Sequence, residues 1–189
     1  MKFFQVGTLV VFVLFFFNAN SQTNGLATIS TRLYLDAESN SINATLDSDT
    51  FQTLFSALKA TDLEKVLGMN GPFTVFAPTN QAFDQLKKEQ FSALFETENR
   101  HQLKALLSYH IVAGNLTAAK MLQAMCRGEG RATFTTVQGN KIMATMQGTD
   151  IILSDGKGNR AKITSADVGR SNGVIHEIDR VIISPRNGL

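Results

Sequence analysis

Three histidines, His101, His110 and His176, are the side chains of this 189-residue chain best suited to proton transfer or metal binding. His176 lies in the stretch SNGVIHEIDRVI, where apolar residues surround it and a glutamate follows it. A zinc site needs three or four ligands, and two of them usually stand close together in the sequence. His-Glu-Ile-Asp is not the His-Glu-x-x-His pattern, and adjacent residues of a strand point to opposite faces. The spacing therefore predicts no bound metal, and a histidine in an apolar strand is expected to be hydrogen-bonded within the fold.

Other catalytic arrangements find equally little support in the sequence. The chain has no Gly-x-Ser-x-Gly turn that would present a serine nucleophile, and no glycine-rich phosphate-binding loop. The stretch DGKGN, residues 155–159, lacks the alternating acidic ligands and the closing glutamate of a calcium loop, so a solvent turn is expected. The lone cysteine, Cys126, has no histidine near it, which favours a small core or loop residue over a reactive thiol. These observations predict a protein that is not an enzyme and that carries no cofactor.

The N-terminal segment is typical of a secretory signal peptide. Lys2 precedes an apolar run over residues 6–17, which is too short to cross roughly 30 Å of hydrocarbon as a helix. Ala19 and Ser21 occupy the −3 and −1 positions of a cleavage site. We therefore expect residues 1–21 to be removed and the mature protein to be secreted, either periplasmic or extracellular, with no membrane span. An uncleaved anchor is the alternative.

The charges of the chain are unevenly distributed. Residues 22–119 hold 7 Lys and Arg against 10 Asp and Glu, whereas residues 120–189 hold 10 against 6. A basic half can attract an acidic polysaccharide or surface, although such a bias is more often a solvated face. The cations are not clustered with interleaved aromatic residues, so no binding of nucleic acid is expected.

Helical periodicity dominates the first half of the chain. Apolar spacing predicts helices over 51–58 and 63–67, the first preceded by the capping residues Ser48 and Asp49. A β-prone run over 73–76 follows and ends at Pro78. Further elements are expected in this order: a helix from 79 or 80 to 86, a helix over 98–108 and a strand over 109–112.

Short strands are expected in the second half, after a helix over 117–125. Glycine-containing turns divide this part into antiparallel strands, which are predicted over 132–137, 141–146, 151–153, 160–164 and 174–183. Helices first and strands later predict an α+β fold rather than alternating βαβ units.

Three motifs resemble signatures of the fasciclin domain. GPFTVFAPTNQAF (residues 71–83) is similar to its first signature, LLSYHIVAGNL (106–116) to its central Tyr-His segment, and SNGVIHEIDRVI (171–182) to its last signature. The motifs occur in order at suitable separations, and TVQGNKI resembles the hairpin of the family. The resemblance covers residues 39–185, which leaves residues 22–38 as a linker or loose extension and residues 186–189 as a tail.

The resemblance implies a fasciclin-like β-wedge or sandwich of antiparallel strands, with helices packed mainly from the N-terminal half. It also implies an extracellular adhesion or matrix-associated module without catalytic activity. The signature residues are expected to hold the fold. They are Phe73, Phe76 and Pro78 around a central strand, Asn172 and Gly173 at a turn that admits positive φ, and His176 on a strand that closes the sheet.

Two segments are candidates for contact with a partner. In animal adhesion members the Tyr-His segment has been proposed as an integrin-binding element, and Tyr109 and His110 match it. A second proposed element corresponds to Asp167 and Val168, with valine in place of isoleucine. A structural role for Tyr109 and His110 is the alternative, and the apolar residues around them favour it. Asp167 is expected to face water and to be dispensable for folding.

Two functions remain open from the sequence. The first is an adhesion module, expected to be a monomer, that recognises a surface protein or a polysaccharide. The second is a carrier of a small apolar ligand, held in a groove between the β-wedge and the helices. Four methionines have the adaptable side chains that could line such a groove, and core packing is the alternative for them. They are Met121, Met125, Met143 and Met146.

Overall fold

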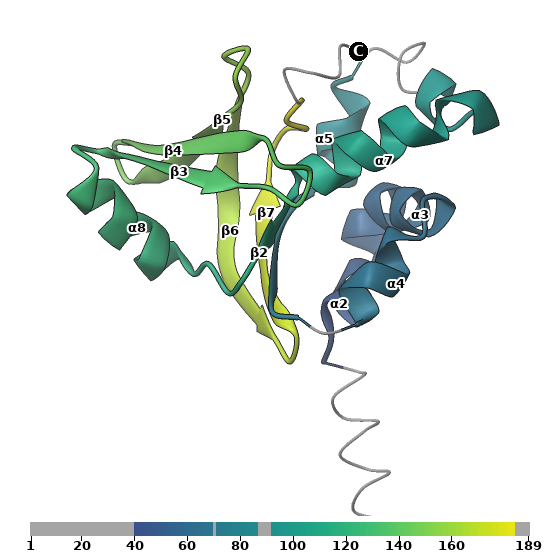
Figure 1. Cartoon of the computed structure of the whole chain (residues 1–189), viewed down its shortest axis with the longest axis horizontal. Coiled ribbons are helices and arrows are strands. Elements are labelled where there is room, and N and C mark those ends of the chain that lie inside the picture. Colours follow the sequence, from purple (N-terminus) through teal and green to yellow (C-terminus); the bar gives the residue numbers. More distant parts are fainter. Residues whose placement is uncertain (1–39, 70, 87–91, 184–189) are drawn as a thin grey trace, which may run out of the picture. The chain divides into compact units, whose positions relative to one another are not determined.

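The computed structural model describes residues 40–69, 71–86 and 92–183, and in these residues seven strands form one sheet (Figure 1). The order of the strands across the sheet is β2-β1-β7-β6-β5-β4-β3. Their bounds are β1 Phe73–Pro78, β2 Ile111–Ala113, β3 Arg131–Thr135, β4 Lys141–Gln147, β5 Asp150–Ser154, β6 Arg160–Arg170 and β7 Gly173–Ile178. The predicted leader, linker and tail, residues 1–21, 22–38 and 186–189, lie outside the described residues.

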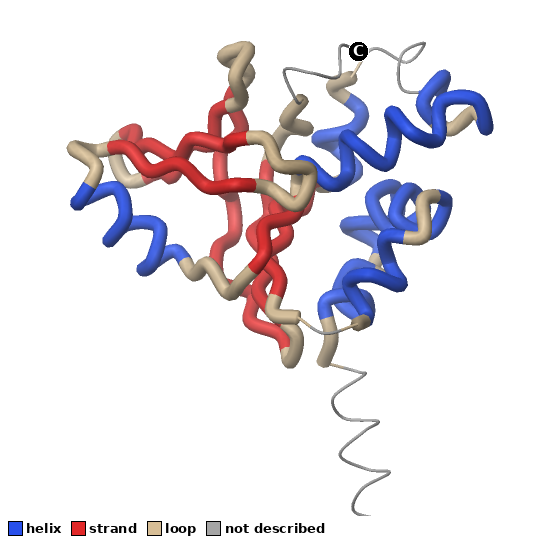
Figure 2. The backbone as a smooth tube through the Cα atoms, in the orientation of Figure 1, coloured by secondary structure: helices blue, strands red, loops and turns tan. Residues whose placement is uncertain are grey.

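Most of the described helices come from the N-terminal half, as the sequence predicts. The bounds of the helices are α2 Ile42–Leu46, α3 Gln52–Ala60, α4 Leu63–Gly68, α5 Asn80–Asp84, α7 Arg100–Tyr109 and α8 Ala118–Arg127, with 3₁₀ turns at Asp49–Phe51 and Thr97–Asn99. Figure 2 shows α8 apart from the other helices, and its contacts are with β3 and β4. The prediction of an α+β fold is confirmed.

The sheet combines an antiparallel meander with one parallel pairing. Strands β3 to β7 follow one another in antiparallel order, as the turn residues predict. Strand β1 pairs in parallel with β7, where Val75 lies opposite Ile175. Val112 of β2 bridges Thr136, the residue after β3, so the two ends of the strand order come together. The expectation that the strand of His176 closes the sheet is wrong, because β7 lies between β1 and β6.

Both faces of β1 are buried, which agrees with its continuous apolar sequence FTVFAP. Val75 belongs to a core cluster with leucines of α3, α4 and α7, among them Leu54, Leu67 and Leu103. The neighbouring Phe76 belongs to a second cluster, which includes Tyr109, Met121, Met125, Ile142 and Leu153. Successive strand residues point to opposite faces, so β1 separates these two clusters.

Several element bounds differ from the sequence prediction. Tyr109 ends α7 instead of opening a strand, and the last strand ends at Ile178 rather than at residue 183. Strand β6 continues to Arg170 through register shifts between Ile163 and Val168. Helix α2 is not predicted from the sequence. It has only five residues, and its start depends on Ser41, whose hydroxyl accepts a hydrogen bond from the backbone N–H of Ala44.

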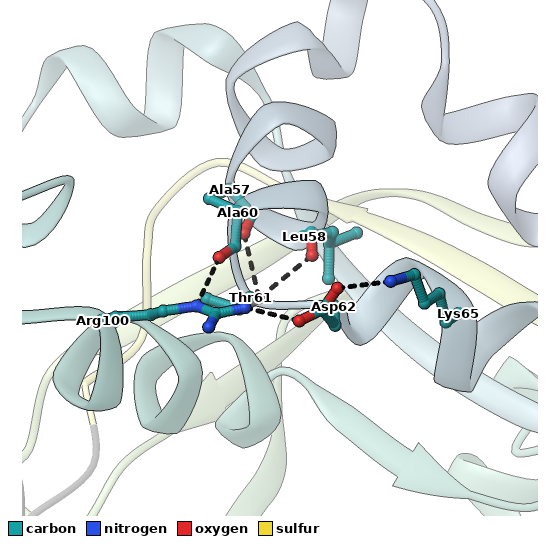
Figure 3. A network of polar contacts seen from close by, with 7 residues as sticks. All are labelled: Ala57, Leu58, Ala60, Thr61, Asp62, Lys65 and Arg100. Carbon is teal, nitrogen blue, oxygen red and sulfur yellow. Dashed lines mark hydrogen bonds and ion pairs between the residues drawn. The ribbon is translucent and has the colours of Figure 1, made fainter. Parts of the chain in front are cut away.

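A polar network joins α3, α4 and α7 (Figure 3). Arg100 donates from Nε to the carbonyl of Ala60 at 2.8 Å and forms an ion pair with Asp62, which also pairs with Lys65 at 2.7 Å. The hydroxyl of Thr61 donates to carbonyls of α3, at 3.0 and 3.1 Å. Hydrogen bonds from Lys65 and Arg100 hold the pKa of Asp62 below its usual value. Because the charged groups face water, the network fixes geometry more than it adds free energy of unfolding.

Candidate interaction surface

Tyr109 is an interior residue. Its side chain is 0% exposed, and its hydroxyl donates a hydrogen bond to the carbonyl of Lys141 at 2.7 Å. Burial, with a smaller contribution from the carboxylate of Asp155, raises the pKa of Tyr109 to about 12, so the phenol keeps its proton. A partner at the surface therefore has no access to this ring in the folded chain.

His110 is also buried, at 2% exposure, and both of its ring nitrogens bind backbone groups. Nδ1 lies 2.9 Å from the carbonyl of Leu106, and Nε2 accepts from the N–H of Ile182 at 3.2 Å. Because a carbonyl can only accept, we assign the proton to Nδ1. Burial lowers the pKa of His110 to about 4, against the opposing effect of the Leu106 carbonyl. The contacts of Tyr109 and His110 match the structural alternative, not direct contact with a partner.

His176 connects three segments of the chain through one neutral ring. Its Nε2 donates to the carbonyl of Leu116 at 2.8 Å, and its Nδ1 accepts from the N–H of Asp167 at 3.2 Å. The ring stacks on Phe76, with centroids 5.7 Å apart and planes inclined by 26°. Desolvation lowers the pKa of His176, while the Leu116 carbonyl and the Asp167 carboxylate oppose the shift. Both nitrogens serve the fold, as the sequence predicts for a histidine in an apolar strand.

Asp167 lies on the irregular part of β6 and has a positive φ of 60°. Its carboxylate accepts a hydrogen bond of 2.7 Å from the backbone N–H of Ala118, the first residue of α8. A negative charge at this end of a helix is favourable. Asp167 is exposed, as expected, while its carboxylate binds the N–H of Ala118 and its own N–H binds His176. That Asp167 is dispensable for folding stays a prediction. The adjacent Val168 is half-buried against the core and pairs with Ile175.

The remaining signature residues also serve the fold. Asn172 accepts from the N–H of Ile42 at 2.8 Å and donates to the carbonyl of Leu67 at 2.7 Å. Gly173 has φ +151°, and a Cβ placed there would lie 1.9 Å from the carbonyl oxygen of Phe73. Phe76 is fully buried and Phe73 half-buried, while Pro78 is the last residue of β1.

In the described part of the chain, an open and partly apolar groove lies beside α8, close to Asp167. We name it the α8 groove. Its volume is about 290 Å³, and it is lined by Ala118, Leu122, Met146, Thr149, Asp150, Ile151, Ile163, Thr164 and Ala166. Leu122 and Met146 are each 39% exposed. Thr117, whose hydroxyl accepts from the N–H of Lys120, caps α8, and Asp167 holds the same helix end.

The methionines of the sequence divide between core and surface. Met121 and Met125, four residues apart on α8, are buried, so the core alternative is confirmed for them. Met146 lines the α8 groove, whereas Met143 is 36% exposed on β4. Cys126 is exposed on α8, which corrects its expected place in the core or a loop. One residue of the sequence indicates the groove. Leu122 is apolar but follows the buried Met121, so it lies beside the buried face of the helix and not on it.

No metal centre is assembled within the described residues, where no three His, Cys, Asp or Glu side chains gather. In the 155–159 loop, Asp155 accepts from the N–H groups of Lys157 at 2.8 Å and Asn159 at 2.9 Å. It also accepts from the N–H of Ile183, and it is 7% exposed. The carboxylate thus binds its own loop and the segment after β7. In the same described part of the chain, every helix is too short or too polar to cross a membrane.

Comparison with known proteins decides the family. Residues 49–184 match the family model of the fasciclin domain. The chain belongs to the fasciclin family. Protein sll1483 of Synechocystis sp. is 36% identical to this fasciclin protein over 168 residues, which cover 88% of this chain and 86% of that protein. Human periostin is 32% identical over 162 residues, 85% of this chain but 18% of periostin.

A solved structure shows the same fold. The FAS1 domain pair from the insect cell adhesion molecule Fasciclin I matches this fasciclin chain with a TM-score of 0.69. The match covers 79% of this chain and 53% of that one, at 15% sequence identity. The likeness at this identity establishes the shared architecture.

Proposed function

We propose that this fasciclin domain is a secreted, non-catalytic adhesion module that binds a surface or matrix protein through the α8 groove. The observation that carries the proposal is the pair of exposed apolar side chains, Leu122 and Met146, lining one concavity. Protein interfaces place apolar and methionine side chains at the centre and polar groups at the rim. Thr149, Asp150 and Thr164 supply such polar groups around the groove.

Two further observations support the proposal. The matching FAS1 domains belong to a cell adhesion molecule. The two buried histidines bind backbone groups through both ring nitrogens, so neither has a nitrogen left to act as a general base. A non-catalytic role agrees with both.

The experiment compares groove variants with variants of equally exposed apolar residues elsewhere. Beads are coated with the full chain and added to the extracellular material of cells that produce this protein, and the attached beads are counted. Leu122→Gln and Met146→Gln are expected to weaken attachment roughly fivefold or more, because apolar contacts at an interface centre are lost. Val66→Gln and Val137→Gln, at 44% and 46% exposed, are the controls and should attach like the wild type. Equal attachment of groove variants and wild type would rule the proposal out.

The second candidate, a carrier of a small apolar ligand, would use the same groove. Its volume of about 290 Å³ is at the lower limit of the roughly 300–1,000 Å³ typical of ligand pockets, which favours contact with a protein. Absorption and mass spectra of the chain purified from its producing cells distinguish the two. A stoichiometric chromophore or lipid that Leu122→Gln fails to retain would establish the carrier function.

A further inference from the structure

A second groove lies on the other face of the β5–β6 ladder. Ile151 and Ile163 line the α8 groove, whereas their chain neighbours Ile152 and Lys162 line this second one. Adjacent residues of a strand point to opposite faces, so these isoleucines line different grooves, which meet at the ion pair between Asp150 and Lys162. We name the second groove the basic groove. Its volume is about 650 Å³, and its polar lining includes Gln147, Asn159, Arg160, Lys162, Asp179 and Arg180.

Two of the three cations that line the basic groove have polar side-chain partners. Arg160 donates to the side-chain carbonyl of Gln147 at 3.0 Å, and the ammonium of Lys162 lies 3.3 Å from the carboxylate of Asp150. Asp179 fixes the strand beneath them, because it accepts from the backbone N–H of Lys162 at 2.7 Å. Within the described residues Arg180 forms no ion pair.

The groove therefore carries an excess of positive charge. The salt bridge to Asp150 offsets the charge of Lys162, and Asp179 offsets one arginine of the pair Arg160 and Arg180. The excess belongs to the C-terminal part of the chain, which holds 10 Lys and Arg against 6 Asp and Glu over residues 120–189. A concavity with a net positive charge concentrates anionic ligands.

We propose that the basic groove binds an acidic polysaccharide whose sugar units carry carboxylate groups. The planar forks of Arg160 and Arg180 suit a carboxylate, to which guanidinium groups donate paired hydrogen bonds. The amides of Gln147 and Asn159 and the carboxylate of Asp179 suit sugar hydroxyls, which both donate and accept. The volume of the basic groove, about 650 Å³, lies within the roughly 300–1,000 Å³ of typical ligand pockets, so the groove can hold more than a single carboxylate group. This inference rests on the proposed adhesion function, because it names a second class of partner for the same secreted module.

The described groove has no aromatic side chain on which a base could stack, which argues against a nucleic acid. The carboxylate of Asp179 repels every anionic polymer, but it can accept from sugar hydroxyls, of which a polysaccharide carries several on each unit.

The test measures binding of the full chain to polygalacturonate, with neutral dextran and poly-glutamate as comparison polymers. The wild type should bind polygalacturonate at low ionic strength, release it as salt rises, and bind both comparison polymers much more weakly. Arg160→Gln and Arg180→Gln should each weaken binding roughly fivefold, and the double variant more than tenfold. Arg131→Gln on β3 and Lys104→Gln on α7 remove cations that are also exposed but lie outside the groove, and they should leave binding unchanged. Unaltered denaturant midpoints show that all variants are folded.

Three results would overturn the inference. They are an absence of binding to polygalacturonate, equal binding to poly-glutamate, and equal losses in the control variants. Failure of the proposed function is a separate outcome, because Leu122→Gln is expected to bind polygalacturonate like the wild type. If Leu122→Gln leaves bead attachment unchanged while the arginine variants no longer bind polygalacturonate, the binding of polysaccharide at the basic groove is supported and adhesion through the α8 groove is contradicted.

Discussion

At the scale of single residues, His176 shows how much structure one neutral imidazole can hold together. Its two nitrogens bind Leu116 and the N–H of Asp167, and its face lies on Phe76. These contacts join β7 to the β6 irregularity and to the segment before α8. Removing the ring takes the hydrogen-bond partner from the N–H of Asp167 and from the carbonyl of Leu116, both in partly buried contacts, and leaves a cavity beside Phe76.

We therefore expect His176→Ala to lower the free energy of unfolding by about 1–3 kcal/mol. Denaturant midpoints give the measurement. His101→Ala is the matched control, because His101 is exposed on α7, and its effect should stay within about 0.5 kcal/mol. A midpoint of His176→Ala equal to that of His101→Ala would contradict a structural role.

The pH dependence of stability follows from His110. The pKa of its ring is about 4 in the folded chain against 6.5 for an ordinary histidine, so the unfolded chain binds more protons between these values. The free energy of unfolding is then complete above pH 6.5 and falls as the pH drops toward 4, by up to roughly 3 kcal/mol. Unfolding at pH 7.5 and pH 4.5 should show the loss in the wild type and a smaller loss in His110→Gln. Equal losses would place the effect on other groups.

The sequence predicts these histidines better than it predicts Asp167. The apolar residues around His110 and His176 indicate burial, and a buried ring must have its nitrogens satisfied. Asp167 looks like a surface residue because its partners are remote in the chain. Ala118 is 49 residues away, and nothing in the local sequence reveals that contact.

At the scale of elements, Asp167 determines how α8 begins. Asp167→Ala should cost about 0.5–2 kcal/mol, because the helix loses an acceptor for its first N–H and alanine tolerates the positive φ poorly. Asp167→Asn keeps an oxygen acceptor and accepts that backbone conformation, so it should cost less. Denaturant unfolding of the two variants checks the order, and a reversed order would show that the cap is unimportant.

The parallel pairing of β1 with β7 depends on Gly173. Any Cβ there would meet the carbonyl of Phe73, so Gly173→Ala should destabilise the chain by more than about 3 kcal/mol. Gly169→Ala on β6 is the control, since no atom lies within 4 Å of its added Cβ and its φ is ordinary. Thermal unfolding of both should separate them clearly. Similar melting temperatures would mean that the close approach of the strands is not required.

Periodicity in the sequence identifies α3, α4, β1 and the meander of later strands, because these depend on local patterns. It does not reveal α2, which is short and capped, or the parallel pairing of β1 and β7 across about a hundred residues. Helix ends also shift where tertiary contacts decide them. Tyr109 is β-prone by type but stays in α7, where its hydroxyl reaches Lys141.

At the scale of the whole domain, the signature residues hold the fold, and the surfaces proposed for binding overlap with the motifs only in part. The motifs place Tyr109, His110, Asn172, Gly173 and His176 in contacts that hold the fold. Leu122 and Met146 of the α8 groove lie outside the three motifs, whereas Arg180 of the basic groove lies within the last signature but is exposed. Sequence resemblance therefore gives the architecture, whereas the contact surfaces need coordinates.

The central claim is that partners meet the α8 groove and not the Tyr-His segment, and one comparison tests it directly. Attachment of coated beads is measured for Tyr109→Phe and Leu122→Gln under conditions in which the same fraction of each variant is folded. Tyr109→Phe removes only the bond from the buried hydroxyl to Lys141, so it should attach like the wild type once folded. Leu122→Gln should lose most attachment while its denaturant midpoint stays within about 0.5 kcal/mol of the wild type. Loss of attachment in folded Tyr109→Phe, with Leu122→Gln unaffected, would contradict the account.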